Sequence, residues 1–420
     1  MKKILFASTA LVAAGLFTTG TASASDKINL QLGGFSKWWV VGAWNSTDFT
    51  KAGNSSYNNG NIKGDNEVWF GGNTALDNGM KVGVDIHLEA GGHTDMTTDT
   101  IDKSYVYIEG GFGKFIVGTN KNGTYLLHVM APDAAGNNGE GGIMTGNYSI
   151  ARPTTVNGMA GGNTTAIDTT NNSEAITYVA PTFYGLTVGA SFLPHGGWED
   201  NRGAMNLNTL TGNLNTSPGD IQEVYGAGAL YANTFGGVGV KVSAGAVTAK
   251  FSGGNQAGNT LGGLPSTWLE QAYGTQLSYA GFTLGGSFRT HHVNYAGDGG
   301  QDTGAFGNIT TIGGSASNGR AYDMGLQYAT GPYAVSFNYF RSAVAHCVNS
   351  NTSASAGVCN NGSDITDMYQ LSGKYNLGAG VDVLASTGYA VYNSALASTS
   401  GGDVNHNSGW VVMSGLSLAF

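Results

Sequence analysis

Polar and apolar residues alternate one by one in about sixteen segments of this chain after residue 24. The clearest segment runs from Lys81 to Glu89, where Val82, Val84, Ile86 and Leu88 alternate with Lys81, Asp85, His87 and Glu89. Such alternation predicts strands whose two faces meet different surroundings. The second face is too polar and too rich in glycine to fill a protein core. The pattern therefore predicts an all-β chain, a transmembrane antiparallel β-barrel with lipid outside and water inside.

The composition agrees with this interpretation. Only 11% of the residues are charged, and 69 of the 420 residues are glycine. No stretch after Ala24 approaches the roughly 20 continuous apolar residues that a membrane helix needs. A closed barrel is then the backbone geometry that pairs every amide inside lipid. Disorder is the alternative for a chain rich in Gly, Asn, Ser and Thr, but the regular alternation argues against it.

The first 24 residues have the three parts of a secretory signal peptide. Lys2 and Lys3 form a basic start, residues 4–17 are apolar, and Ala22-Ser23-Ala24 is a small-residue cleavage motif. We therefore expect residues 1–24 to be removed on export and residues 25–420 to form a single barrel domain. Loss of the two lysines leaves 16 basic and 27 acidic residues, a formal charge of −11.

Turn signals give the expected topology. Seven short turns are predicted near residues 77–79, 110–113, 182–185, 234–237, 280–281, 330–332 and 378–380. Eight long polar stretches lie near residues 45–65, 90–100, 121–172, 194–220, 251–266, 293–318, 342–364 and 393–406. Their alternation predicts about sixteen strands, within two, with both termini at the short-turn end. The two-residue alternation of polar and apolar residues is interrupted in Leu30 to Trp44 and in Gln222 to Ala232. A barrel of this size has a water-filled lumen.

Three motifs resemble those of a known family. They are the segment Gly111 to Gly118, the stretch from Asn172 through Tyr178 and Pro181 to Leu186, and the terminal Gly415 to Phe420, with the opening Leu30 to Trp44 as a looser fourth match. Together they resemble the general diffusion porins of the Gram-negative outer membrane, closest to the alphaproteobacterial type. Thr119 stands where that family often has arginine, so its basic pore cluster is not carried over to this chain.

The resemblance implies an outer-membrane location, a homotrimer and passive diffusion of small hydrophilic solutes and ions. In that family the terminal aromatic residue, here Phe420, is part of the signal read by the barrel-assembly machinery. The expected partners are therefore those solutes and ions, outer-membrane lipid and the assembly machinery, without nucleic acid.

The longest polar stretch, residues 121–172, lies where such porins carry a loop that folds into the lumen. It begins with an apolar segment, Tyr125 to Met130, which we expect to pack against the inner wall. The candidate constriction residues of this loop are Tyr125, His128, Asp133, Glu140 and Arg152. The acidic balance predicts a preference for cations. The alternative is that Asp133 and Glu140 are solvated loop charges.

Charged residues inside the membrane-spanning segments should face the lumen, because lipid-facing Arg or Lys costs about 2–4 kcal/mol at the midplane. The expected wall residues are Lys81, Asp85, His87, Glu89, Lys103, Tyr105, Tyr107, Lys241, Glu270, Arg289, His291, Asp323 and Lys374. Most aromatic residues near segment ends are interpreted as interfacial anchors. Tyr105 and Tyr107 share the polar parity, so they are the best candidates for a sugar-stacking surface.

Cys347 and Cys359 are the two cysteines, and both fall in the long stretch 342–364. An exported protein and this close spacing favour a disulfide. A metal site is the weaker alternative, because the nearby His346 supplies only one further ligand.

No sequence motif indicates catalysis. The histidines are scattered, and the glycine-rich runs lack the Gly-Lys-Ser or Gly-Lys-Thr ending of a phosphate loop. We therefore expect a channel that is not an enzyme and has no cofactor or metal. A substrate-selective porin, for example for sugars, is the first alternative. An outer-membrane barrel hydrolase and a structural or adhesive barrel are the others.

Overall fold

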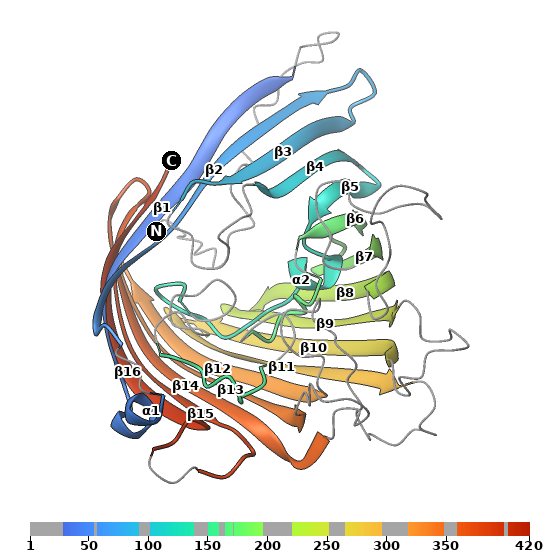
Figure 1. Cartoon of the computed structure of the whole chain (residues 1–420). Helices are drawn as coiled ribbons and strands as arrows, with labels where there is room; N and C mark the ends of the chain where they lie inside the picture. The colour runs from blue at the N-terminus through green and yellow to red at the C-terminus, as the bar shows by residue number, and fades with distance from the viewer. Residues whose placement is uncertain are drawn as a thin grey trace.

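In a computed structural model, sixteen strands pair in chain order and the last strand pairs with the first. The result is a closed antiparallel barrel, seen from one end in Figure 1. The structure describes residues 28–53, 57–91, 101–137, 150–158, 164–170, 172–195, 221–251, 265–295, 318–347, 359–398 and 402–420. The expected signal peptide and Glu140 lie outside these ranges. Within them, no helix is both long enough and apolar enough to cross a membrane.

The strand bounds follow the alternating segments of the sequence. The first eight strands are β1 (Asn29–Asn45), β2 (Gly60–Ala75), β3 (Lys81–Glu89), β4 (Ile101–Gly110), β5 (Gly113–Asn120), β6 (Ser173–Val179), β7 (Leu186–His195) and β8 (Ile221–Phe235). The other eight are β9 (Val238–Phe251), β10 (Pro265–Tyr279), β11 (Phe282–Tyr295), β12 (Gly319–Thr330), β13 (Tyr333–Cys347), β14 (Cys359–Gly378), β15 (Val381–Asn393) and β16 (His406–Ala419). Two short helices, α1 (Thr47–Ala52) and α2 (Gly123–Leu126), follow β1 and β5.

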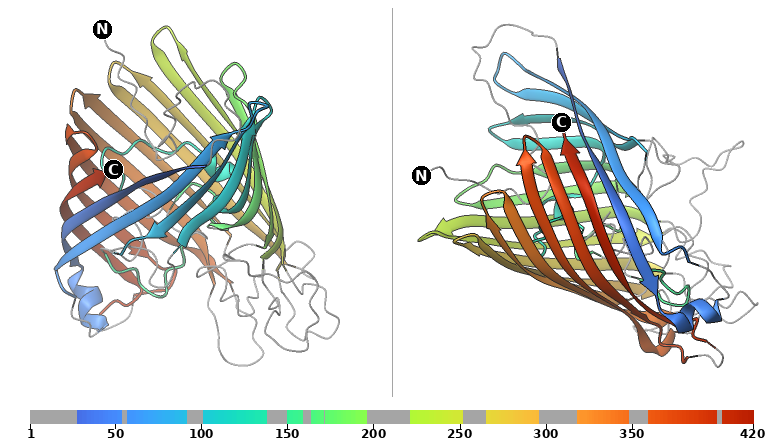
Figure 2. Two further views of the ribbon diagram at one scale, coloured as in Figure 1. Left: turned by 90° about the horizontal axis from the view of Figure 1, so that it is seen from above. Right: turned by 90° about the vertical axis from the view of Figure 1, so that its left-hand side faces the viewer.

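Short turns join the strands at one end of the barrel, and helix α1 lies at the other end (Figure 2). Both residues of Ala280-Gly281 have positive φ angles, 48° and 87°, as do Tyr184 and Gly185. Two successive positive φ angles are the geometry of the two-residue turns that match the twist of β-hairpins. Sixteen strands with both termini at the short-turn end confirm the topology predicted from the sequence.

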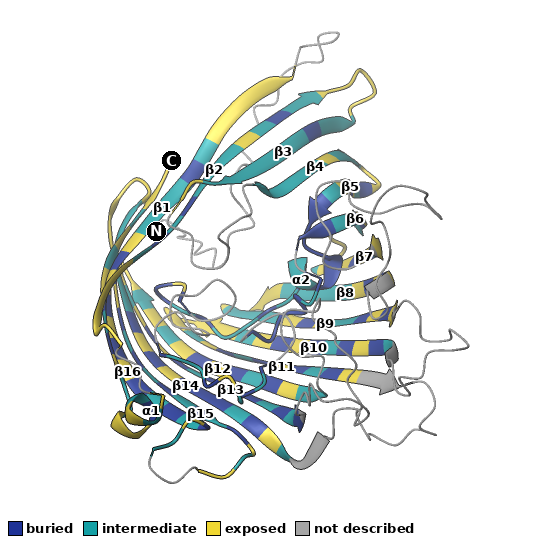
Figure 3. Ribbon diagram, in the orientation of Figure 1, coloured by how far each residue is buried: buried dark blue, intermediate teal, exposed yellow. Residues whose placement is uncertain are grey.

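The two faces of each strand differ as the alternation predicted. On β11, Phe282 and Leu284 are 52% and 57% exposed on the outer face, while Ser287, Arg289 and His291 on the inner face are buried. On β12, Met324 is exposed and Asp323 is buried. Figure 3 shows this alternation of exposed and buried residues along β8 to β14. The apolar residues that lie outside would face lipid in a membrane, so polar residues collect inside the barrel.

The barrel closes where the C-terminus meets β1. The backbone N–H of Gly34 donates to the carbonyl of Phe420 at 3.0 Å, and the N–H of Phe420 donates to the carbonyl of Gly34 at 3.1 Å. The Phe420 ring is 65% exposed, on the same outer face as Leu416 and Leu418. The last residue therefore completes the seam and extends the apolar outer face.

Deletion of Phe420 is expected to lower the yield of assembled barrel strongly, because it removes the two hydrogen bonds to Gly34 and the expected assembly signal. Quantifying folded protein in isolated outer membranes measures the effect. Phe183→Ala is the control, since Phe183 is an exposed turn aromatic away from the seam. Equal yields from the deletion, the control and the natural chain would contradict the expectation.

The two cysteines lie on strands, so their placement within a long loop was wrong. Cys347 ends β13 and Cys359 begins β14, and the two residues are directly opposed in the strand register. Directly opposed residues of an antiparallel pair have Cα atoms about 4.5–5.5 Å apart. That separation lies inside the range that disulfides span. The expected disulfide would thus join the ends of two adjacent strands.

A disulfide between Cys347 and Cys359 is expected in the exported protein, because the register brings the two residues together in an oxidising compartment. Peptide mass spectrometry without reductant should find the two cysteine peptides linked, and reductant should release them. Two alkylated thiols in protein that was never reduced would refute the pairing.

Candidate functional site

The segment that follows β5 lies against the inner face of the barrel wall. Helix α2 begins after Asn122, whose side-chain Oδ1 accepts the N–H groups of Thr124 and Tyr125, each at 3.0 Å. The N–H of Gly123 donates to Ser191 Oγ on β7 at 2.7 Å. The Asn122 cap thus starts a turn whose first amide is already bound to the wall.

After α2 the chain crosses the wall from β9 toward β13. The N–H of Val129 donates to Ser243 Oγ at 3.0 Å, and the N–H of Ala131 donates to Asp323 Oδ1 at 3.1 Å. Wall amides donate in return, Gln276 to the carbonyl of Met130 at 2.7 Å and Asn338 to that of Pro132 at 2.6 Å. Short polar wall side chains thus satisfy the backbone of a segment without secondary structure. Figure 1 shows this segment inside the ring of strands.

Asp133 fixes the turn that follows. Its carboxylate accepts the N–H groups of Ala135 at 3.1 Å and Asn137 at 2.6 Å. It also accepts Ser336 Oγ at 3.2 Å and Gln370 Nε2 at 3.1 Å, which lie on β13 and β14. Asp133 is therefore an anchor between loop and wall, and it remains half-buried. Its second role, as a charge in the water-filled passage, is a proposal.

The returning part of the loop covers a buried charge cluster on β10 and β11. Glu270 Oε2 accepts Arg289 Nη2 at 2.8 Å, and Glu270 Oε1 lies 2.6 Å from His291 Nδ1. Arg289 also donates to the carbonyls of Thr164 at 3.3 Å and Ala166 at 2.9 Å. Arg289 and Glu270 are fully buried. Removing one partner would leave an unpaired buried charge, which costs about 3–5 kcal/mol.

Thr165 and Thr169 complete this contact. Thr169 Oγ1 donates to Glu270 Oε1 and accepts Arg289 Nη2 at 2.7 Å. Thr165 Oγ1 donates to Asp323 Oδ2 at 2.9 Å. The expected wall residues Glu270, Arg289 and Asp323 thus point inward, but the loop covers them. They hold the loop in place and do not border open water.

His128 lies in the same packed region of the loop. Its Nε2 is 3.4 Å from Thr165 Oγ1. Burial lowers the pKa of His128 to about 4, and the nearby Arg289 guanidinium acts in the same direction. His128 is therefore neutral at pH 7. Because its folded pKa lies below the ordinary value near 6.5, loop docking is strongest above about pH 6.5 and weakens as the pH falls toward 4.

On the opposite part of the wall, β1 to β5, the inward charged side chains stay partly exposed, whereas the apolar inward residues Trp39 and Val41 of β1 are buried with loop residues. On β3 and β4, the expected wall residues Lys81, Asp85, His87, Glu89, Lys103, Tyr105 and Tyr107 are all half-buried. Lysines and carboxylates are interleaved there, as in the Lys37–Asp65 pair at 3.8 Å. The inner surface is thus divided into a wall covered by the loop and an accessible wall of β2 to β4, whose charged side chains stay partly exposed.

Contacts hold the tyrosines of the accessible wall in place. Tyr105 Oη donates to Asp85 Oδ2 at 2.9 Å. The Lys114 ammonium lies 4.0 Å from the centre of the Tyr107 ring. The Tyr105 hydroxyl is thus already hydrogen-bonded, and the Tyr107 ring already contacts a cation. Neither arrangement resembles an open aromatic surface for stacking sugars.

The remaining predicted residues lie apart from this site or outside the described residues. Lys241 and Lys374 face inward near the short-turn end, where Lys374 Nζ is 3.9 Å from Asp382 Oδ2. Arg152 lies in the loop and is half-buried, and Tyr125 packs below the Lys121 ammonium at 5.1 Å. Glu140 lies outside the described residues.

Several anchoring residues were missed by the sequence reasoning. The buried ion pair of Lys121 and Asp168 closes the two ends of the loop at 2.6 Å. Ser191, Ser243 and Ser336 accept loop amides. Their signal was present in the sequence, as small hydroxyl side chains at inward parity, but it is shared by many residues that have no such contact.

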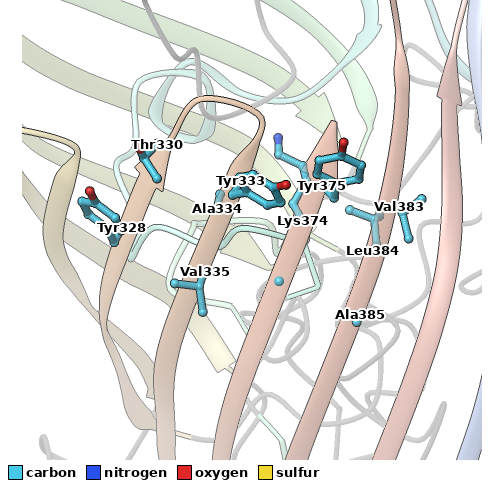
Figure 4. A pocket seen from close by; sticks show the side chains of 11 residues that line it. Tyr328, Thr330, Tyr333, Ala334, Val335, Lys374, Tyr375, Val383, Leu384 and Ala385 are labelled. Atoms are coloured by element: carbon cyan, nitrogen blue, oxygen red, sulfur yellow. The ribbon is translucent and has the colours of Figure 1, made fainter. Parts of the chain in front are cut away.

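A shallow hollow of about 390 Å³ lies near the short-turn end of β12 to β15. Tyr328, Tyr333 and Tyr375 border it, and their side chains are exposed on the outer face (Figure 4). The rings of Tyr333 and Tyr375 stack at 4.8 Å. These residues match the aromatic girdle of a membrane barrel at the headgroup level. The hollow is separate from the inner surface.

Comparisons with solved structures find the same barrel. An anion-selective porin from Comamonas acidovorans superposes with a TM-score of 0.56 at 14% identity, covering 94% of this chain and 100% of the other. The trimer form of OmpT, an outer membrane protein of Vibrio cholerae, gives 0.53 at 12% identity, covering 94% and 100%. The outer membrane channel DcaP of Acinetobacter baumannii gives 0.53 at 13% identity, covering 95% and 99%.

A comparison with curated protein sequences finds no match. A family model described as Gram-negative porin, however, matches residues 7–395, nearly the whole chain. The family model agrees with the closed sixteen-stranded barrel, its polar inner face and the resemblance of the three sequence motifs. The chain therefore belongs to the Gram-negative porin family.

Proposed function

We propose that the protein is an outer-membrane channel for passive diffusion of small hydrophilic solutes and ions. The observation that carries this proposal is a closed barrel with an apolar outer face and an inner wall, β1 to β5, whose charged side chains remain partly exposed. A barrel of sixteen strands is wide enough for an aqueous passage. Positively and negatively charged side chains on this wall keep the passage hydrated.

The channel is proposed to work without catalysis, cofactor or nucleic acid. The buried Glu270, Arg289 and His291 contact one another and the loop, an arrangement that suits anchoring. General diffusion is preferred to sugar selectivity because Lys114 covers the Tyr107 ring and Asp85 accepts the Tyr105 hydroxyl.

Export, assembly and oligomeric state are further parts of the proposal. The chain would lose residues 1–24 on export and be inserted by the barrel-assembly machinery into outer-membrane lipid. We propose a homotrimer, supported by family membership and by the trimer form of the OmpT relative in fold.

The segment 121–172 is proposed to narrow the passage. Its support is the series of contacts from Ser191 on β7 to Gln370 on β14, which carry the loop across half of the inner wall. Solutes would then pass between this loop and the accessible wall of β2 to β4. Hydrogen bonds to the wall hold the loop in place, so the position of the loop on the wall sets the width of the passage.

Glycines on the wall let the loop backbone approach closely. A Cβ atom on Gly274 of β10 would lie 1.8 Å from the carbonyl oxygen of Val129. One on Gly285 of β11 would lie 3.0 Å from Pro132, and one on Gly325 of β12 would lie 3.2 Å from Ala131. Any side chain at Gly274 therefore pushes the loop away from the wall.

The charge preference is proposed to be for cations and to be modest. On β1 to β5, the inward charges are nearly balanced between lysines and carboxylates, Lys37, Lys63, Lys81, Lys103 and Lys114 against Asp65, Glu67, Asp85, Glu89, Asp102 and Glu109. The net charge of the passage then depends on the loop, where Asp133 and Glu140 add negative charge. Charges in a narrow passage are less screened than those on external loops, whose reach salt limits to roughly 8–10 Å.

Purified protein in a planar bilayer is expected to give stable ionic steps, with a reversal potential in a salt gradient that favours cations. Asp133→Asn with Glu140→Gln should shift the reversal potential toward anions. Replacing Asp133 changes both the charge and the loop docking, because its carboxylate accepts four hydrogen bonds. Glu140→Gln alone therefore tests the effect of charge by itself. Folded protein without conductance would contradict the channel. An unshifted reversal potential in both variants would remove the two acids from the passage.

Gly274→Ala is expected to lower the single-channel conductance, because the new methyl group displaces the loop at Val129 toward the passage. The strain should destabilise the docked loop by about 1–3 kcal/mol. Gly71→Ala is the matched control, since Gly71 is an inward strand glycine whose added Cβ would meet nothing closer than 3.7 Å. Equal conductance in the two variants would show that the Val129 contact does not set the width.

A further inference from the structure

A group of potential metal ligands lies on the accessible wall, where β2, β3 and β4 run side by side. Glu67 of β2, His87 of β3 and Asp102 of β4 each offer one ligand atom, and these atoms all lie within 4.8 Å of one another. Glu67 Oε2 is 3.3 Å from His87 Nδ1. Two ligands bound tetrahedrally to zinc at about 2.0–2.1 Å are about 3.4 Å apart. The Glu67–His87 separation therefore already fits such a site.

The second nitrogen of His87 has the partner that a metal-bound histidine usually has. Its Nε2 lies 3.4 Å from Asp85 Oδ1, and Tyr105 Oη donates to the other oxygen of Asp85 at 2.9 Å. A carboxylate at the far nitrogen fixes the tautomer in which Nδ1 carries the lone pair. Trp69 stacks on the imidazole with 5.0 Å between ring centres. The ring is thus held with Nδ1 toward Glu67.

Asp102 brings the third ligand and links the group to the loop. Asn172 Nδ2, at the end of the loop, donates to Asp102 Oδ1 at 2.5 Å. The Lys103 ammonium lies 2.5 Å from Asp102 Oδ2 and supplies the local positive charge. Lysine is a flexible cation on a long stem, so a divalent ion can replace its ammonium at the carboxylate.

We propose that Glu67, His87 and Asp102 form a binding site for a divalent transition-metal ion inside the barrel, with Asp85 as the positioning residue of His87. One imidazole and two carboxylates suit zinc and copper, whereas magnesium and calcium prefer oxygen ligands alone. The Glu67 and His87 side chains are each 15% exposed, so an ion in the passage can reach them. The site goes beyond the diffusion function, because binding does not require conduction.

The test is calorimetric titration of zinc chloride into untagged, chelator-treated protein in detergent. The natural protein should bind one zinc ion per chain, with little heat from magnesium. His87→Ala should weaken binding by at least about 100-fold, and Asp85→Asn by about 10–100-fold. Lys103→Met should lower the Kd, because it removes a competing cation. His406→Ala is the control, since His406, the first residue of β16, pairs with Asp403 at 2.8 Å and lies outside the proposed site.

Two results would overturn the site. One is natural protein that is folded by circular dichroism and takes up no zinc. The other is binding that persists unchanged in His87→Ala or disappears in His406→Ala, which would place the ion elsewhere. If His87→Ala does not fold, Glu67→Gln is the isosteric replacement, with the same expected loss. Conductance of the same samples is measured separately, so a missing metal site and a missing channel give different results.

Discussion

Pairing of backbone amides is the constraint on which this structure depends. Inside lipid an unpaired N–H or C=O costs several kcal/mol, so a sheet can cross a membrane only when it has no open edge. Closure of β1 on β16 meets that requirement, and it leaves one face of every strand for lipid and one for the interior. The side-chain alternation, the interior position of the charges and the available lumen all follow from closure.

The interior then presents a second problem of the same kind, because loop backbone enters it without secondary structure. Serine, asparagine, glutamine and aspartate side chains of the wall pair those backbone groups, and glycine lets the chains approach. The buried Glu270–Arg289 pair adds a contact that is costly to break on one side only. The wall under the loop is therefore a docking surface, whereas the inward charged side chains of β2 to β4 remain partly exposed.

Strand number, turn positions and parity could be predicted because each depends on neighbouring residues only. The interrupted alternation in Gln222 to Ala232 has a local cause as well, a bulge in which Gln222 pairs with Lys250 and Tyr225 with Thr248. The sequence predicted that the loop packs against the inner wall but not which wall residues it covers, since parity places Arg289 and His87 on the same inner face. The group of Glu67, His87 and Asp102 was missed because its members come from three strands, at spacings that match no metal motif.

The seam has a consequence for the order of folding. Phe35 of β1 pairs with Ala419 of β16, so the two strands that complete the barrel come from opposite ends of the chain. A ribosome must release nearly the whole sequence before this contact can form, and closing so long a loop carries a large entropic cost. Until then β1 presents an open edge that can pair with other chains. A chain that lacks its last strand keeps this open edge and can aggregate through it. A barrel of this topology therefore needs protection by chaperones until the last strand has been made.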